Sequence, residues 1–351
     1  MLDGTSFRDL VSGRRRGIGA SLTRGLLRLA EVPYASAVRW RNRRYDRTPA
    51  AAHRVGVPVV SVGNLTLGGT GKTPLVKWLA HWFAQRGVKL AIVSRGYGTT
   101  AGRQNDEALE LAQALPGVPH VQDPDRVAAA RRAIEQFAGQ LIVLDDGFQH
   151  RRLARDLDIV LVDATEPFGF EHVFPRGTLR EPLDGLARAE VVCLSRADLL
   201  DPAGRERIRH RVAELAPRAA WCEAAHVPCE LRNATGNAEP LSALAGRRVA
   251  AFCGIGNPAA FRHSLATAGC QIVSWREFPD HHPYAAADRA ELESDIADSE
   301  CELAVCTQKD LVKLPVDELA GRPLWALAIE IQILAGSEEL EAALQRVAPT
   351  S

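Results

Sequence analysis

Pro58-Val-Val-Ser-Val-Gly-Asn-Leu-Thr-Leu-Gly-Gly-Thr-Gly-Lys-Thr-Pro74 is the stretch that decides the fold of this 351-residue chain. Its first part, residues 59–62, predicts a short buried strand, and residues 74–84 predict the start of a helix. Between them lies a glycine-rich turn whose backbone N–H groups can wrap around phosphate oxygens at the positive end of the helix. The stretch therefore predicts a phosphate-binding loop and an α/β fold of the P-loop NTPase type.

The residues of this loop have distinct expected roles. Lys72 would reach the outer phosphates, and the hydroxyl of Thr73 would ligate Mg²⁺. Thr66 stands where the pattern G-x-x-x-x-G-K-[ST] has its first glycine, so the loop resembles instead a compact Gly-Gly-x-Gly-Lys-Thr variant. A chance glycine-rich turn is the alternative, but strand, glycines, Lys-Thr and helix follow one another in the required order. The expected nucleotide-binding set is Gly68, Gly69, Thr70, Gly71, Lys72 and Thr73.

The charge of the chain is balanced overall but uneven along its length. The formal net charge is zero, yet residues 1–49 carry eleven arginines against four acidic residues, and the remainder is correspondingly acidic. Seven cysteines without a C-x-x-C pair indicate buried thiols in a reducing compartment. No apolar run approaches the ~18 residues of a transmembrane helix. Arg24 and Arg28 interrupt the apolar segment that a signal peptide needs, so we expect the N-terminus to be retained and cytoplasmic.

The basic N-terminal segment has an amphipathic pattern. Leu22, Leu26 and Leu29 recur at helical spacing, with arginines on the other side, and Trp40 follows among further arginines. An apolar stripe with flanking cations and interfacial aromatics is typical of a helix that lies on an anionic membrane surface. A helix packed on the domain with a solvated basic face is the equal alternative, and RNA binding is less favoured.

Apolar strands alternate with helical segments through the rest of the chain. This alternation predicts a mostly parallel sheet flanked by helices, followed by a second, smaller α/β lobe with its own sheet. The pattern weakens between the two. We therefore expect four regions: an N-terminal membrane-associating segment at 1–49, a P-loop core at 50–220, a connector at 221–245 and the smaller lobe at 246–351.

The apolar strand at 141–145 ends in two carboxylates. In a P-loop fold such a strand lies beside the loop strand, so Asp145 or Asp146 would contact Mg²⁺ directly or through water, and the sequence leaves open which one. Gln149, three residues later, could orient a phosphate or hydroxyl, or could cap the loop. A second strand, at 90–94, delivers Arg95 to the same edge of the sheet, where it could bind a phosphate.

Four further groups of residues could take part in chemistry. Asp106 opens a helix, where by itself a capping role is the better explanation. The turn at 278–284 contains His281 and His282, which suit pairing with a carboxylate base better than zinc binding. The loop at 174–182 is basic, through Arg176 and Arg180, and suits an anionic group. The turns 195–198 and 307–310 loosely resemble the base-reading turn of GTPases, without its leading Asn.

Taken together, these motifs resemble the tetraacyldisaccharide 4′-kinase family. The loop motif is generic, whereas Asp-Asp-Gly-Phe-Gln-His combined with Phe-x-Asp-His-His is specific. One departure is Gln104-Asn105, where Val-Gly is expected. The matching motifs are 63–74, 94–97, 106–107, 144–150, 174–182, 254–258, 278–282 and 307–310.

The resemblance implies a function. It implies ATP- and Mg²⁺-dependent phosphorylation of the 4′-hydroxyl of a lipid-linked glucosamine disaccharide, a lipid A precursor, at the cytoplasmic face of the bacterial inner membrane. It favours the membrane interpretation of the N-terminal segment, with no nucleic acid and no obligate protein partner. The implied catalytic residues are Asp106 as base, His281 (favoured over His282) as its partner, Lys72 and Asp146, and the implied substrate-binding residues are Asn64, Arg95, Arg176, Arg180 and His282.

Two other classes share a loop of this kind. A GTPase or metallochaperone-type nucleotide switch would prefer GTP and depend on a partner, and the 278–282 cluster argues against it. A P-loop ligase acting on a small soluble acid would need no basic amphipathic N-terminus.

Overall fold

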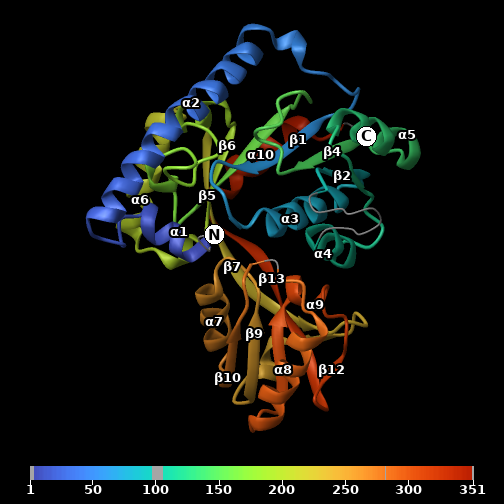
Figure 1. Ribbon diagram of the computed structural model, residues 1–351. Coiled ribbons are helices and arrows are strands. Elements are labelled where there is room, and N and C mark those ends of the chain that lie inside the picture. The colour runs from blue at the N-terminus through green and yellow to red at the C-terminus, as the bar shows by residue number, and fades with distance from the viewer. Residues whose placement is uncertain (1–3, 97–105, 281, 350–351) are drawn as a thin grey trace.

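A computed structural model describes residues 4–96, 106–280 and 282–349 of the chain. Within them, thirteen strands form one sheet, in the order β10-β9-β11-β13-β7-β6-β5-β1-β4-β2-β3, with β12 and β8 paired to its long strands. The mostly parallel sheet flanked by helices is confirmed. The expectation of a separate sheet in the smaller lobe is wrong, because the two lobes share this one (Figure 1).

The first lobe contains the parallel strands that position the phosphate loop. Strand β1 lies between β4 and β5, and Val62 of β1 is level with Asp145 of β4. All residues of β1, β4 and β5 are buried, which explains their nearly continuous apolar sequence. The strands are β1 (Val59–Asn64), β2 (Leu90–Ser94), β3 (His120–Gln122), β4 (Leu141–Asp145), β5 (Leu157–Asp163) and β6 (Val191–Ser195).

Helices cover both faces of this half of the sheet. On one face, Leu75 and Leu79 of α3 share a core with Leu111 of α4 and Leu344 of α10. On the other face, α5 packs on one group of strands, and α6 and part of α2 pack on another. The bounds are α3 (Lys72–Ala84), α4 (Asp106–Ala114), α5 (Arg126–Phe137), α6 (Pro202–Leu215) and α10 (Ser337–Val347).

Two long antiparallel strands join the lobes. Strands β7 (Ala220–Arg232) and β13 (Arg322–Ala335) pair along most of their length, and Figure 1 shows them running from one lobe into the other. Residues 221–232, the first part of the connector expected at 221–245, therefore belong to a strand. The chain returns through β13, so α10 packs on the first lobe. The four-region division, with its last region at 246–351, stays a proposal.

In the smaller lobe, one helix covers each face of the sheet. Phe261 and Leu265 of α7 pack on one face, and Leu292 and Ile296 of α8 pack on the other. Its elements are β8 (Ala238–Pro240), β9 (Arg248–Cys253), α7 (Pro258–Thr267), β10 (Gln271–Glu277), α8 (Ala286–Asp298), β11 (Leu303–Thr307), α9 (Gln308–Leu311) and β12 (Glu318–Leu319). All seven cysteines are free thiols, and five of them are buried.

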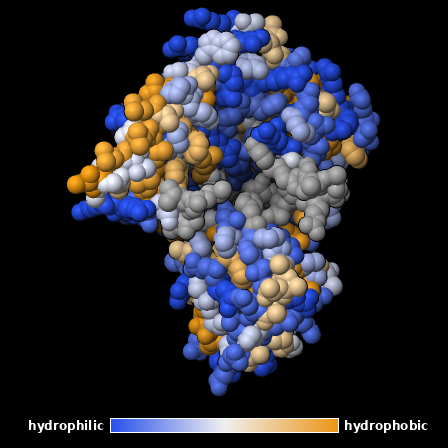
Figure 2. Space-filling model, in the orientation of Figure 1, coloured by the Kyte–Doolittle hydropathy of each residue, from blue (hydrophilic) through white to orange (hydrophobic). Residues whose placement is uncertain are grey.

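The N-terminus forms two helices, α1 (Gly4–Val11) and α2 (Ile18–Arg47). One side of α2 contacts the first lobe, with Ala35 and Val38 buried. The other side is exposed and apolar, and Figure 2 shows hydrophobic side chains gathered along it. Its exposed residues include Ile18, Leu22, Leu26, Leu29, Val32 and Trp40. No helix in the described ranges combines the length and the apolar composition that a bilayer crossing requires.

Candidate active site

The phosphate loop connects the buried end of β1 to the first turn of α3. Gly71 adopts a left-handed conformation, with φ of 89°, and α3 begins immediately after it. A Cβ atom on Gly71 would also collide with the ring of His226. Both the backbone conformation and the lack of space therefore require glycine at this position. This conformation turns the chain sharply from strand to helix and brings the positive end of α3 to the loop.

Side chains hold the carbonyl oxygens of the loop from outside. Ser195 Oγ donates to the carbonyl of Thr70 at 2.8 Å, and Arg196 donates to that of Gly69 at 2.9 Å. Both donors belong to the 195–198 turn, which we considered for nucleobase recognition. Its first two residues instead brace the loop, and Arg196 also pairs with Asp163. These two bonds fix the conformation of the loop, whose backbone N–H groups we expect to face an anionic ligand.

The two aspartates at the end of β4 lie beside the loop. Asp145 is buried, and Asp146 follows it in a left-handed conformation with φ of 53°. Asp146 Oδ1 lies 3.3 Å from Lys72 Nζ, and both of its oxygens accept from Arg180 at 2.8 Å. Burial raises the pKa of Asp146, but Lys72 and Arg180 outweigh it and lower the pKa to about 2. The carboxylate is therefore ionised at neutral pH.

The chemistry of this donor set fits a nucleotide phosphate group with Mg²⁺. Carboxylate and hydroxyl oxygens are the ligands that Mg²⁺ prefers, and Thr73, Asp145 and Asp146 supply them here. Thr70 Oγ1 is buried in the loop and has no hydrogen-bond partner among the described residues. A buried hydroxyl without a partner is costly, which agrees with a polar ligand at this position.

Gln149 and Asn64 stabilise the entrance to the loop. Asn64 accepts from Lys72 at 3.3 Å through its side chain, and its carbonyl accepts from Gln149 at 2.9 Å. Gln149, expected at the nucleotide, also donates to Glu181 at 2.9 Å. Sequence reasoning missed Glu181, although this residue lies in the 174–182 motif. This fully buried acid also accepts from Asn42 of α2 at 2.7 Å, and so ties the N-terminal helix to the site.

The structure separates the three arginines that we predicted for substrate binding. Arg180 lies at the centre of the site, where it donates to both carboxylate oxygens of Asp146. Arg176 lies toward the N-terminus, where it donates to the carbonyl of Val11 at 2.9 Å. Arg95 is exposed just after the end of β2.

The predicted base and its histidine partner are described only in part. The backbone of Asp106 begins α4, but its side chain lies outside the described residues, as does His281. His282 is described, with Nε2 2.9 Å from Asp288 and its ring stacked on Phe278 at 4.7 Å between centroids. Both of these contacts of His282 are therefore with residues of the smaller lobe.

The second possible base-reading turn, 307–310, has its aspartate buried in the protein. Asp310 is fully buried, where one carboxylate oxygen accepts from Tyr284 at 2.9 Å and from the Gly254 amide at 3.0 Å. The other oxygen accepts from Thr307 at 2.6 Å. Burial raises the pKa of Asp310. Its contacts stabilise the start of α9. Base recognition by the 307–310 turn stays a prediction.

His226 on β7 is a second residue that sequence reasoning missed. It lies against Gly71, and burial lowers its pKa to about 3, so the imidazole is neutral at pH 7. No local motif points to it, and it lies in the segment 221–245 that was expected to be a connector. The contact brings the strand that joins the lobes directly to the phosphate loop.

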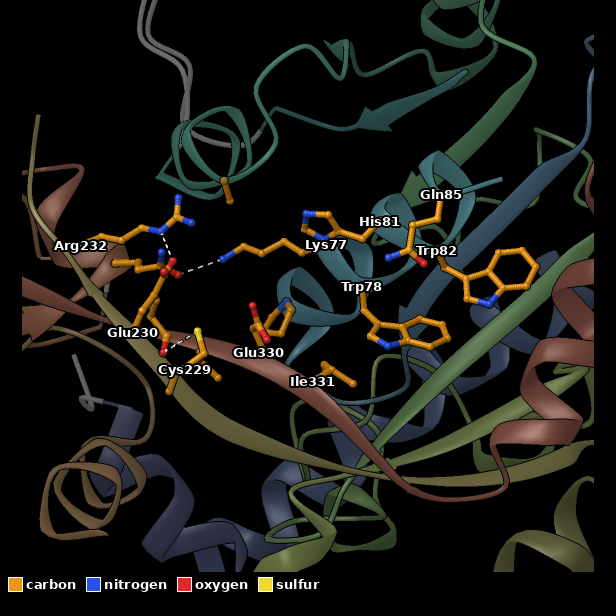
Figure 3. A pocket seen from close by; sticks show the side chains of 15 residues that line it. Lys77, Trp78, His81, Trp82, Gln85, Cys229, Glu230, Arg232, Glu330 and Ile331 are labelled. Carbon is orange, nitrogen blue, oxygen red and sulfur yellow. Dashed lines mark hydrogen bonds and ion pairs between the residues drawn. The ribbon is translucent and has the colours of Figure 1, made fainter. Parts of the chain in front are cut away.

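A pocket of about 440 Å³ lies along α3, between the first lobe and the joining strands (Figure 3). Lys77 lines it and donates to Glu110 of α4 at 2.7 Å and to Gln308 of α9 at 3.0 Å. Glu110 is one turn beyond Asp106 on α4. Lys77 therefore connects the loop helix, the helix of the predicted base and the smaller lobe.

Comparison with known proteins places these features in context. A family model described as "Tetraacyldisaccharide-1-P 4'-kinase" matches residues 23–348. A tetraacyldisaccharide 4′-kinase of Anaeromyxobacter dehalogenans is 41% identical, over 94% of this chain and 92% of that protein. One of Syntrophus aciditrophicus is 36% identical, over 88% and 89%. The crystal structure of LpxK from Aquifex aeolicus in complex with ATP is similar with a TM-score of 0.74 and 28% identity, over 93% of this chain and 100% of that one.

Proposed function

The chain belongs to the tetraacyldisaccharide 4′-kinase family, and on that premise we propose how its residues phosphorylate the 4′-hydroxyl of a tetraacylated glucosamine disaccharide 1-phosphate. It is an ATP-dependent kinase of lipid A biosynthesis. The observation that carries the mechanism is the meeting of Lys72, Asp146 and Arg180 beside the phosphate loop.

The donor end of the site neutralises phosphate charge. The loop N–H groups and Lys72 would bind the phosphates of ATP, and Thr73 with Asp145 or Asp146 would hold Mg²⁺. Bound there, Mg²⁺ supplies a Lewis acid that offsets charge on the transferring group. Lys72 would exchange its contact with Asp146 for the phosphates. Arg180 holds Asp146 in place and keeps it ionised. Preorganised charges of this kind are the main source of catalysis in phosphoryl transfer.

The acceptor end would activate the sugar hydroxyl. Asp106 would accept the hydroxyl proton as the oxygen attacks, with His281 oriented against it, and a positioned base contributes on the order of 10²–10⁴ in rate. Lys77 supports this role, because its bond to Glu110 holds α4 against α3. Arg95, Arg176 and His282 stay proposals for the anionic and polar groups of the disaccharide.

The exposed stripe on α2 would bring the enzyme to its lipid substrate. Leu22, Leu26 and Leu29 have 66%, 67% and 71% of their surface exposed, although each is a residue that folding normally buries. Arginines flank the stripe, and each basic residue close to an anionic bilayer adds roughly 1 kcal/mol of attraction. We therefore place the enzyme peripherally on the cytoplasmic face of the bacterial inner membrane, with anionic lipids as its surface.

The test is transfer of ³²P from [γ-³²P]ATP to tetraacyldisaccharide 1-phosphate in detergent micelles. The wild-type chain should label the lipid and should prefer ATP to GTP, and Lys72→Ala should abolish the labelling. Label that appears only as inorganic phosphate, or only with GTP as donor, would reject the proposal and would favour a nucleotide switch.

A further inference from the structure

Helix α1 lies at the phosphate loop, although it precedes residues 23–348, the part that the family model matches. Leu10 and Val11 have only 3% and 2% of their surface exposed, so the helix is inserted into the protein. Phe7 packs on Phe174, with ring centroids 6.1 Å apart. An isolated helix of eight residues would be unstable in water, so these contacts fix its position.

Two arginines hold the end of this helix. The last carbonyl groups of a helix have no partner within it. Here the carbonyl of Leu10 accepts from Arg24 at 3.2 Å, and that of Val11 accepts from Arg176 at 2.9 Å. Arg176 therefore anchors α1 from the basic loop, in addition to the substrate contact proposed for it. It follows that the side chains of α1 are presented to the site in a defined position.

Arg8 of α1 points at the phosphate loop. Its Nη2 atom lies 2.7 Å from the point that a Cβ atom on Gly68 would occupy, and Gly68 has φ of 112°. Its Nε lies 3.5 Å from Glu166, and its Nη1 lies 3.5 Å from the carbonyl of Gly256 in the smaller lobe. The guanidinium therefore lies over the first glycine of the loop, between the two lobes.

Arg8 is held more loosely than two other arginines at the loop. Arg180 makes bonds of 2.8 Å to Asp146, and Arg196 pairs closely with Asp163. The contacts of Arg8 are both 3.5 Å, and 40% of its side-chain surface is exposed, against 24% for Arg180. An arginine with weak contacts can redirect its N–H groups to a bound anion at small cost.

We propose that Arg8 contacts the terminal phosphate of the nucleotide during transfer, as an arginine supplied in cis. Such arginines stabilise charge on the transferring group in other P-loop enzymes. Arg8 would donate N–H groups to its oxygens and would form no covalent bond. The acceptor oxygen bonds to the γ-phosphorus, the bond to the β–γ bridging oxygen breaks, and the hydroxyl proton goes to Asp106. This inference rests on the proposed function, because it requires ATP at this loop.

The test compares two replacements of Arg8 with a surface control. Arg8→Met removes the charge and keeps the length of the side chain, and Arg8→Lys keeps the charge but not the planar fork. Arg54→Met is the control, because Arg54 is 77% exposed and forms a surface ion pair with Asp156, at 3.1 Å. For each full-length protein, calorimetry measures the affinity for Mg·ADP with and without aluminium fluoride, a mimic of the transferring group. The kinetic assay measures kcat and KM.

Arg8→Met should lower kcat by on the order of 10³, and should weaken binding of the aluminium fluoride complex by a similar factor. Its affinity for ADP should stay within about threefold of the wild type. Arg8→Lys should recover part of the loss, and Arg54→Met should show none.

Equal losses of ADP and aluminium fluoride affinity would overturn the proposal, because they would mean that Arg8 only braces the loop. Unchanged kcat in Arg8→Met would also overturn it. If a thermal melt shows that Arg8→Met is unfolded, the affinities for ADP with and without aluminium fluoride are compared for Arg8→Lys instead. The binding measurements need no lipid acceptor, so they separate a failure of this inference from a failure of the proposed acceptor.

Discussion

The donor and acceptor ends of the site are built differently. The donor end is built mainly on one contiguous stretch, 59–73, which Ser195 of a neighbouring strand holds through the carbonyl of Thr70 and beside which Asp146 lies. The acceptor end, as proposed, combines Asp106 at the start of a helix in the first lobe with His281 in a turn of the smaller lobe. On this proposal, phosphate binding depends on local structure, whereas activation of the hydroxyl depends on how the two lobes meet.

Removing the loop lysine should break the donor end and give the largest effect. In Lys72→Ala the phosphates lose their main side-chain cation and Asp146 loses one of its two partners. We expect kcat to fall by on the order of 10³ or more, because positioning and electrostatics supply most of phosphoryl transfer. Steady-state lipid phosphorylation measures this, with a thermal melt as control. A fall of less than tenfold would mean that another cation fills the role.

Removing the base should break only the acceptor end. In Asp106→Ala we expect kcat to fall by about 10²–10⁴ with the KM for ATP nearly unchanged. The lipid phosphorylation assay measures both values across a range of ATP concentrations. Wild-type turnover would show that the base is another residue, even if the substrate is right.

Changing the apolar stripe should affect neither end of the site. The triple variant Leu22→Ser, Leu26→Ser and Leu29→Ser should bind anionic vesicles at least about tenfold more weakly, because apolar area drives interfacial binding. Its stability should not fall, since the three side chains are largely exposed already. Vesicle sedimentation measures the binding, and neutral vesicles are the control. Unchanged binding would favour a helix that merely packs on the domain.

Lys77 tests the connection between the two ends. Lys77→Met would leave Glu110 buried without its cation, which costs about 3–5 kcal/mol when one partner of a buried pair is removed. Lys77→Met combined with Glu110→Gln should recover most of that loss. We expect a modest fall in kcat to persist in the double variant, because α4 is no longer held to α3 and α9. Chemical denaturation and the kinetic assay measure the two effects, and full recovery of kcat would assign Lys77 to stability alone.

The smallest effect concerns pH and the donor end alone. The pKa of Asp146 is lowered from 3.8 to about 2 in the folded protein. A lowered pKa adds stability above pH 3.8, and this stability is lost as the pH falls toward 2. The shift corresponds to at most about 2.5 kcal/mol, since each unit is worth about 1.4 kcal/mol. Wild type and Asp146→Asn should therefore converge in stability between pH 4 and pH 2 in denaturant titrations. A constant difference across this range would show that Asp146 is not held ionised by Lys72 and Arg180.

Much of the donor end could be predicted from sequence because its signals are local. Strand, glycines, Lys72 and the first turn of α3 are consecutive, and the aspartates follow their own strand. The shared sheet could not be predicted, because β7 contains Glu223, His226 and Glu230 and pairs with a strand 100 residues away. The contacts of Glu181, His226 and Arg8 were missed for the same reason, since each joins segments far apart in the chain.

The most direct test of the central claim is a titration of wild type, Asp106→Ala and Lys72→Ala with Mg·ATP. If the donor end works independently of the acceptor end, Asp106→Ala binds ATP as tightly as the wild type and Lys72→Ala binds it at least about tenfold more weakly. Loss of ATP binding in Asp106→Ala, or full binding in Lys72→Ala, would contradict the account.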